Sequence, residues 1–167
     1  MNCRYLPPPL CLYLTIFVLY FHSQNPATMT MIHTYLTFNG NCREAMTFYK
    51  ECLGGELSLQ TIGESPMSVD IPPFMKPFIL HSSLTKGPLV LTGSDMVPEM
   101  GLTAGNTVSL FLNCNSEAEA RTFYKRLSKN GTATHPLENT FWGALFGTLT
   151  DQFGYHWLIS FEGNSRQ

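Results

Sequence analysis

The sequence predicts an α+β fold of two tandem βαβββ units, whose curved sheets surround a central cleft. Three observations support this prediction: a short segment that occurs twice, a helix-start signal at each copy, and strand-like runs in the same order around both copies. EAMTFYK at 44–50 recurs as EARTFYK at 119–125, with six identities in seven residues at an offset of 75. We interpret this pattern as an internal duplication in which each copy is one structural unit.

Residues 1–28 are expected to precede the fold rather than belong to it. Residues 10–21 are a nearly unbroken run of twelve apolar residues, which is shorter than the roughly 20 residues that a membrane-spanning helix needs. Three interpretations stay open: translation that starts at Met29 or Met31, a signal-like or anchoring segment, or a structural extension. The predicted organisation is an extension at 1–28, a domain at 29–161 with units at about 31–94 and 107–161, and a tail at 162–167.

In the first unit, the run IHTYLTF at 32–38 predicts a strand, and a helix is expected over about 42–53. Asn41 followed three residues later by Glu44 is a capping-box pattern, and the pair Gly54-Gly55 is a helix-stop signal. Three more strand-like runs follow, bounded by Gly, Pro and Asn residues. They lie at 56–62, 78–84 and 89–92.

The second unit repeats this order. TVSLFLN at 107–113 predicts a strand, and Ser116 with Glu119 is a second capping-box pattern that begins a helix over about 117–129, with Gly131 as its stop. The strand-like runs that follow lie at 132–135, 144–150 and 156–161. One helix covers only part of the apolar surface of such a sheet, so we expect the two units to pack together.

Composition limits the possible classes of function. The 167 residues include 44% hydrophobic and 13% charged residues, carry a formal net charge of -2, and contain no run of Lys or Arg. Nucleic-acid binding is therefore not expected, because it requires a basic surface. No membrane contact is expected for residues 29–167. Five scattered Cys residues without a CxxC pair favour a cytoplasmic location; export or membrane association is the alternative if the N-terminal apolar segment is retained.

Four stretches together resemble one known family. FNGN precedes the first helix, TFWG stands at 140–143, and the pattern F-G-x-L-x-D-x-F-G-x-x-W begins at Phe146. With the duplicated βαβββ plan, they resemble the PhnB-like branch of the vicinal oxygen chelate superfamily, which includes glyoxalases, bleomycin-resistance proteins and dioxygenases. The resemblance implies the fold of that superfamily and a homodimer. It does not identify a catalytic residue, because one scaffold hosts several activities. The stretches are 34–56, 78–84, 106–131 and 136–159.

The resemblance also implies where a metal ion would bind. Enzymes of the superfamily hold a divalent metal with His, Glu or Gln side chains from the first and last strands of each unit. Leu and Ser do not replace such ligands, so we expect a metal-free cleft without a cofactor. A divalent metal such as Zn, Ni or Mn held by His33 and His81 is the alternative. The corresponding positions are Thr34 or His33, Val90 or Leu91, Ser109 and Leu158.

Strand alternation selects the first pocket candidates. In 32–38 it places His33 and Tyr35 on one face, and in 78–84 it separates His81 from the more apolar positions. If the apolar faces pack on the helices, these three side chains point into the cleft. His81 also matches a His of PhnB-like relatives, and we predict that it forms hydrogen bonds or transfers protons near neutral pH.

Aromatic residues supply the other pocket candidates. Phe141 and Trp142 occupy a turn-like segment closed by Gly143, and we expect them at the mouth of the cleft. An apolar wall with a few polar groups is typical of a small-molecule pocket. Three further aromatic residues are candidates for the wall, namely Phe74, Phe111 and Trp157.

The resulting prediction is a protein that binds a small, partly apolar molecule in its cleft. A metal-dependent lyase or isomerase of the glyoxalase type is one alternative. Another is antibiotic sequestration, which would need an acidic groove. An older label for this branch is ubiquinone-pathway methyltransferase. Methyl transfer is not expected here, because the sequence lacks a Gly-rich strand-to-helix loop for a nucleotide-type methyl donor. The acidic residues available for such a groove are Glu64, Asp70, Asp95 and Glu99.

Overall fold

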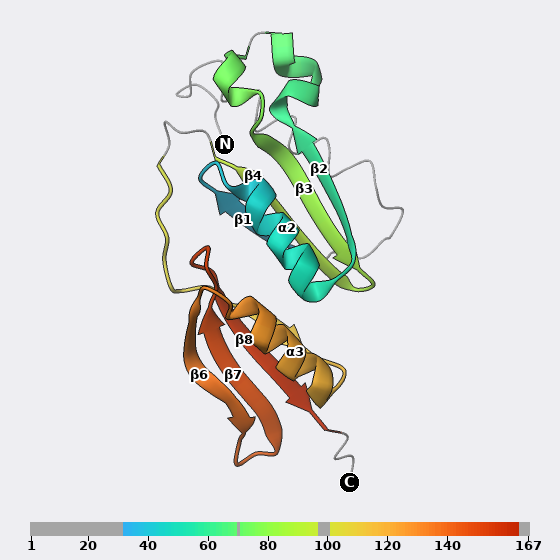
Figure 1. Ribbon diagram of the computed structural model, residues 1–167, viewed down its shortest axis with the longest axis vertical. Coiled ribbons are helices and arrows are strands. Elements are labelled where there is room, and N and C mark those ends of the chain that lie inside the picture. Colours follow the sequence, from blue (N-terminus) through green and yellow to red (C-terminus); the bar gives the residue numbers. More distant parts are fainter. Residues whose placement is uncertain (1–31, 70, 97–100, 164–167) are drawn as a thin grey trace. The chain divides into compact units, whose positions relative to one another are not determined.

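The first unit has the expected βαβββ order (Figure 1). The computed structural model describes residues 32–69, 71–96 and 101–163, so the extension predicted for residues 1–28 lies outside the described residues. Short 3₁₀ turns connect the second and third strands at Ile62–Glu64, Pro66–Val69 and Pro73–Met75. The main elements are β1 (Thr34–Phe38), α2 (Cys42–Leu53), β2 (Glu56–Thr61), β3 (Ile79–Lys86) and β4 (Leu89–Asp95).

The second unit repeats the order with altered boundaries. The strand predicted to end at residue 135 continues through Pro136, and irregular pairing on both sides of His135 accompanies the proline. A β-bulge of this kind lets a strand include a residue that has no backbone N–H. The elements are β5 (Leu110–Asn113), α3 (Glu117–Leu127), β6 (Thr132–Asn139), β7 (Ala144–Thr150) and β8 (His156–Glu162).

Each unit forms a mixed four-stranded sheet. The strand orders are β1-β4-β3-β2 and β5-β8-β7-β6. In both sheets the first strand pairs in parallel with the last, and the remaining neighbours are antiparallel. One helix lies across one face of each sheet, α2 on the first and α3 on the second (Figure 1). The predicted α+β class and its two βαβββ units are confirmed.

The two helices begin with different caps. Ser116 Oγ accepts a hydrogen bond from the backbone N–H of Glu119 at 3.1 Å, which is one half of the capping box predicted for α3; the Glu119 carboxylate accepts from the N–H of Asn115 and not from that of Ser116. The capping box predicted at Asn41 and Glu44 is wrong, because the Asn41 side chain makes no cap hydrogen bond and its backbone (φ -116°, ψ 19°) is not extended. Instead, Asp95 Oδ1 in β4 accepts a hydrogen bond from the Cys42 N–H at 2.8 Å.

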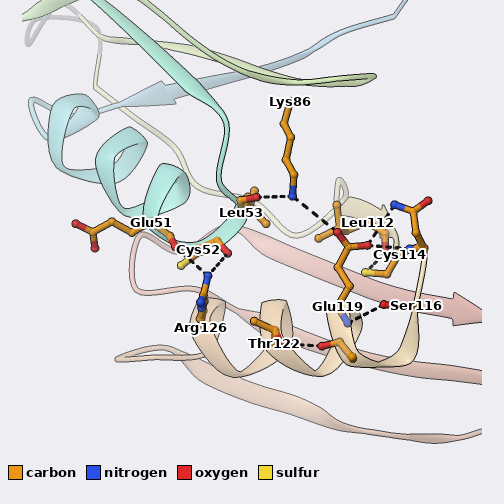
Figure 2. Close-up of polar contacts among 12 residues, drawn as sticks. Glu51, Cys52, Leu53, Lys86, Leu112, Cys114, Ser116, Glu119, Thr122 and Arg126 are labelled. Carbon is orange, nitrogen blue, oxygen red and sulfur yellow. Dashed lines mark hydrogen bonds and ion pairs between the residues drawn. The ribbon is translucent and has the colours of Figure 1, made fainter.

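A polar seam joins the C-terminal end of α2 to the second unit. In Figure 2, Arg126 of α3 points at this end, and its Nη1 lies 3.3 Å from the carbonyl oxygens of both Glu51 and Cys52. Lys86 Nζ lies 2.9 Å from the carbonyl oxygen of Leu53 and 3.8 Å from Glu119 Oε1. Both cations therefore sit at the helix end that carries unpaired carbonyl groups and the negative end of the helix dipole.

The buried core is continuous between the two units. It lies between helix and sheet in each unit, and contains Phe38, Tyr49 and Leu84 from the first and Leu127 and Ile159 from the second. No helix in the described part of the chain is long and apolar enough to cross a membrane.

Candidate functional site

The face of the first sheet opposite α2 carries a row of polar side chains, here called the polar face. Leu36, Leu84 and Leu91 are buried on the helix side, so the residues that alternate with them lie on the other side. The strand register aligns these polar residues across the sheet, with the exposed Glu56 at one margin. They are Tyr35, Thr37, Ser58, Gln60, His81, Ser83, Thr92 and Ser94.

Hydroxyl groups on the polar face are held by hydrogen bonds. The Tyr35 hydroxyl donates to Ser94 Oγ at 2.7 Å, and Thr92 Oγ1 donates to the carbonyl oxygen of Thr34 at 2.7 Å. Burial raises the pKa of Tyr35 above its ordinary value. Tyr35 is therefore a neutral phenol at physiological pH, fixed in orientation by Ser94.

His81 and Gln60 face each other across the β2–β3 pair. Burial lowers the pKa of His81, so its imidazole is neutral near pH 7, the form in which one ring nitrogen is a donor and the other an acceptor. Gln60 Oε1 is buried and has no hydrogen-bond partner within the described residues. Because buried polar atoms in proteins are usually paired, this side of the polar face has an unused hydrogen-bond acceptor.

The strand register separates His33 from His81. Ser82 aligns with Gly93, and Gly93 aligns with Leu36 of β1. His81 lies one residue beyond this level, toward the C-terminal end of β1, and His33 lies three residues before it, in the opposite direction. The two histidines are therefore four residues apart along the strand direction, or about 13 Å at ~3.3 Å per residue. Two imidazoles that bind one zinc ion each approach it to about 2.1 Å. The pair therefore does not form the two-histidine metal site considered as the alternative.

Other positions at which the resemblance implies metal ligands are also separated. Thr34 and Leu91 pair with each other on the face that α2 covers, whereas Leu158 pairs with Phe111 in the second sheet. Among residues 32–69, 71–96 and 101–163, no group of three or more His, Cys, Asp or Glu side chains is arranged to hold a metal ion.

Phe141 and Trp142 lie at the tip of the β6–β7 hairpin. Their rings pack edge to face with centroids 4.7 Å apart, and the side chains are 97% and 58% exposed. The hairpin is closed by Thr140, whose N–H and hydroxyl both donate to the carbonyl oxygen of Ala144 at 2.8 Å. Phe141 and Trp142 therefore form an exposed aromatic tip, and their location at the mouth of a cleft stays a prediction.

Trp157 is a core residue and not part of an open wall. Alternation in β8 places it on the same side as Ile159, facing α3, and both are buried. Its Nε1–H donates to Asp151 Oδ2 at 2.8 Å, and the Tyr49 hydroxyl donates to the same oxygen at 2.7 Å. Asp151 is thus a buried acceptor that joins the two units.

The acidic groove considered for antibiotic binding is not formed by the described acidic residues. The two carboxylate oxygens of Asp95 accept hydrogen bonds from the N–H groups of Cys42 and Ile79, both at 2.8 Å. Glu64 is bound to Thr61 in a capping box. Asp70 and Glu99 lie outside the described residues.

The three cysteines in the described part of the chain have protonated thiols. Burial raises the pKa of Cys42 to about 12 and the pKa values of Cys52 and Cys114 to about 11. Because the thiolate is the nucleophilic form, none of these thiols is prepared for covalent chemistry.

The two βαβββ units have the glyoxalase/bleomycin resistance/dioxygenase fold. A solved glyoxalase/bleomycin resistance protein/dioxygenase from Nocardioides has the same fold, with a TM-score of 0.50 and 20% identity over 91% of this chain and 96% of that one. The chain belongs to the family described as 3-demethylubiquinone-9 3-methyltransferase, whose model matches residues 30–160.

Three individual proteins are similar to this chain over most of its length. The chain is 29% identical over 136 residues to protein YjdN of Escherichia coli (strain K12), covering 75% of this chain and 91% of that protein. The crystal structure of protein PA1353 from Pseudomonas aeruginosa has a TM-score of 0.72 and 38% identity, covering 80% of this chain and 98% of that one. A structure described as a putative 3-demethylubiquinone-9 3-methyltransferase, PhnB protein, from Bacillus cereus has a TM-score of 0.64 and 24% identity, covering 79% and 99%.

Proposed function

We propose that this protein binds a small, partly apolar molecule against the polar face of the first sheet, without a metal ion. The observation that carries the proposal is the set of neutral hydrogen-bonding groups there: the Tyr35 phenol, the neutral His81 imidazole and the buried Gln60 oxygen. The half-buried part of this face contains no charged side chain, since Glu56 lies at its exposed margin. An uncharged ligand group suits it, because an unpaired charge is costly to bury.

The metal-free part of the proposal is supported by the strand register. The large separation of His33 from His81 leaves each without a second histidine ligand from the other strand. Val90 and Leu158, at other positions implied by the resemblance, have no ligand atoms. A glyoxalase-type lyase or isomerase would need a divalent metal to polarise its substrate, so this alternative is disfavoured.

Methyl transfer, named in the family description, is not proposed for this chain. The junction between β1 and α2 is FNGN, which is not the Gly-rich phosphate-binding loop found at nucleotide-type sites. Antibiotic sequestration is disfavoured too, because Asp95 is occupied by two backbone N–H groups. A homodimer, which the resemblance implies, and a cytoplasmic location, which the scattered cysteines favour, complete the proposal.

A fragment screen of the full-length protein by amide NMR shifts tests the proposal. We expect small, uncharged, partly apolar compounds to shift the amide signals of β1, β3 and β4, and His81→Ala to weaken this binding at least tenfold. His33→Ala is the matched control, since His33 is exposed and far along the strand. Binding that both variants weaken equally, or that maps to other elements, would refute the polar face as the site.

A further inference from the structure

A cavity that does not include the pocket candidate on β3 is lined by residues of both units. It has a volume of about 210 Å³ and is located where β1, the connection between the units and the β7–β8 turn meet. Neither His81 nor Gln60 lines it. Leu102, Val108 and Phe153 give it an apolar wall, and its lining within the described chain contains no Lys, Arg, Asp or Glu.

His156 supplies a polar group to this cavity. It is the first residue of β8, it lines the cavity, and its Nδ1 lies 2.9 Å from Thr150 Oγ1 on the neighbouring strand. This hydrogen bond restricts the ring and leaves Nε2 as the nitrogen that a ligand can use. Nε2 is a donor in one neutral tautomer and an acceptor in the other, so a ligand with a hydroxyl group satisfies either form.

The opposite side of the cavity is fixed and uncharged. The Tyr155 hydroxyl donates to the carbonyl oxygen of Thr37 at 2.7 Å, and the Tyr155 ring packs against Phe38 with centroids 5.4 Å apart. Burial raises the pKa of Tyr155 to about 12, so this wall offers a neutral phenol that is already engaged. This side of the cavity therefore offers no charged group to a ligand.

We propose that this cavity is a second binding site, which takes a small uncharged molecule with an apolar, ring-sized body and one hydroxyl group that meets His156. The volume corresponds to about seven water molecules at ~30 Å³ each, which is the size of a single substituted ring. The site shares one residue, Thr37, with the polar face, but it uses neither His81 nor Gln60, so binding here and binding at His81 can be tested separately.

Two probes of equal size separate the hydrogen bond from simple cavity filling. Phenol and toluene have the same number of non-hydrogen atoms, and only phenol carries a hydroxyl group. We titrate each into the full-length protein, follow the amide signals of Gly105 and Gly154, which line the cavity, and include benzoate as the charged probe. We expect phenol to bind about tenfold more tightly than toluene, as one hydrogen bond allows, and benzoate not to bind.

His156→Phe removes the ring nitrogen and keeps the ring. Phenol should then bind no better than toluene, and retained toluene binding shows that the cavity is intact. His135→Phe is the matched control: His135 is exposed, its Nδ1 lies 3.0 Å from Thr148 Oγ1, and it does not line the cavity. Equal binding of the two probes to the wild type, an unchanged phenol preference in His156→Phe, or no shift at Gly105 and Gly154 up to the solubility limit of both probes would each overturn the proposal.

Discussion

The two units begin their helices with nearly the same seven residues and secure them by different means. The N-terminus of α3 is capped locally, by Ser116 on the Glu119 N–H and by the Glu119 carboxylate on the Asn115 N–H. The N-terminus of α2 is capped from a distance, by Asp95 at the end of β4. The comparison shows that duplicated sequence preserves the element, whereas its stabilising contacts depend on where each unit lies in the fold.

The repeated tyrosines differ in the same way. Tyr124 stays within its own unit, where its hydroxyl donates to the carbonyl oxygen of His135 at 2.8 Å. Tyr49, its equivalent, is fully buried and donates to Asp151 of the other unit. Equivalent positions also meet directly, since Arg126 contacts the carbonyl oxygen of Glu51, 75 residues away. This separation equals the repeat offset, so two equivalent positions of the repeat contact each other near the C-terminal turns of the two helices.

The largest effect is expected from Asp151→Asn, which breaks the link between the units. Asp151 is 3% exposed. Within the described residues both of its carboxylate oxygens are acceptors, for the Tyr49 hydroxyl, the Trp157 indole N–H and the backbone N–H groups of Phe153 and Tyr155. In Asp151→Asn an NH2 group would replace one carboxylate oxygen, and this donor would face the hydrogen-bond donors that the oxygen had accepted from. We expect a loss of about 3–5 kcal/mol in the free energy of unfolding, measured by urea denaturation.

A control for this variant is Gln152→Ala, next to Asp151 in the chain. Among the described residues its side chain bonds to the exposed Asn130 alone, at 3.2 Å, so we expect a loss below about 0.5 kcal/mol. Equal losses in the two variants would contradict a link through Asp151.

Asp95, which caps α2 from β4, should contribute more to the free energy of unfolding than Ser116, which caps α3 locally. Asp95→Asn leaves one of two backbone N–H groups, those of Cys42 and Ile79, without its carboxylate acceptor, and we expect a loss of about 2 kcal/mol. Ser116→Ala removes only the exposed cap of α3, for which about 1 kcal/mol is typical. We compare the urea denaturation midpoints of the two variants. A larger loss of stability in Ser116→Ala than in Asp95→Asn would contradict this prediction.

The tyrosine pair gives a smaller, sharper comparison. Tyr49→Phe removes one donor from a buried carboxylate that keeps its other three, so we expect a loss of about 1.5 kcal/mol. Tyr124→Phe removes a bond to a carbonyl oxygen at the exposed His135, and about 0.5 kcal/mol is expected. Equal losses, measured by thermal denaturation, would show that the two repeats are energetically equivalent.

The smallest expected effect is the loss of stability at acidic pH that results from protonation of His81. Its pKa is lowered in the folded protein, so the unfolded chain binds the proton more readily and stability falls as pH drops below the ordinary value of about 6.5. His81→Gln should flatten this part of the pH dependence of unfolding. The NMR titration of His81 checks the cause directly, and a midpoint at or above 6.5 would contradict it.

Local signals predicted the order of the elements well. The helix expected over about 42–53 is observed as Cys42–Leu53, because its stop at Gly54 depends on residues close in sequence. The α-helix Glu117–Leu127 ends before the predicted residue 129, and its cap at Ser116 is local as predicted. Sequence alone did not indicate the roles of Asp95 and Asp151, because both accept hydrogen bonds from strands or helices far along the chain.

The candidate site was predicted only in part. Period-two alternation correctly placed Tyr35 and His81 on one face. The same alternation in HWLISFE groups Trp157 with Ile159, and the structure shows this to be the buried side. Gln60 gave no sequence signal, because its importance comes from a buried oxygen opposite His81.

The central claim, a metal-free site of neutral hydrogen-bonding groups, is tested most directly by elemental analysis. The full-length wild type and His81→Ala are purified after growth with Zn, Ni, Mn and Fe supplied. We predict far less than one metal ion per chain in both proteins. One bound metal ion per wild-type chain that is lost in His81→Ala would contradict the claim and favour a metal-dependent lyase or isomerase.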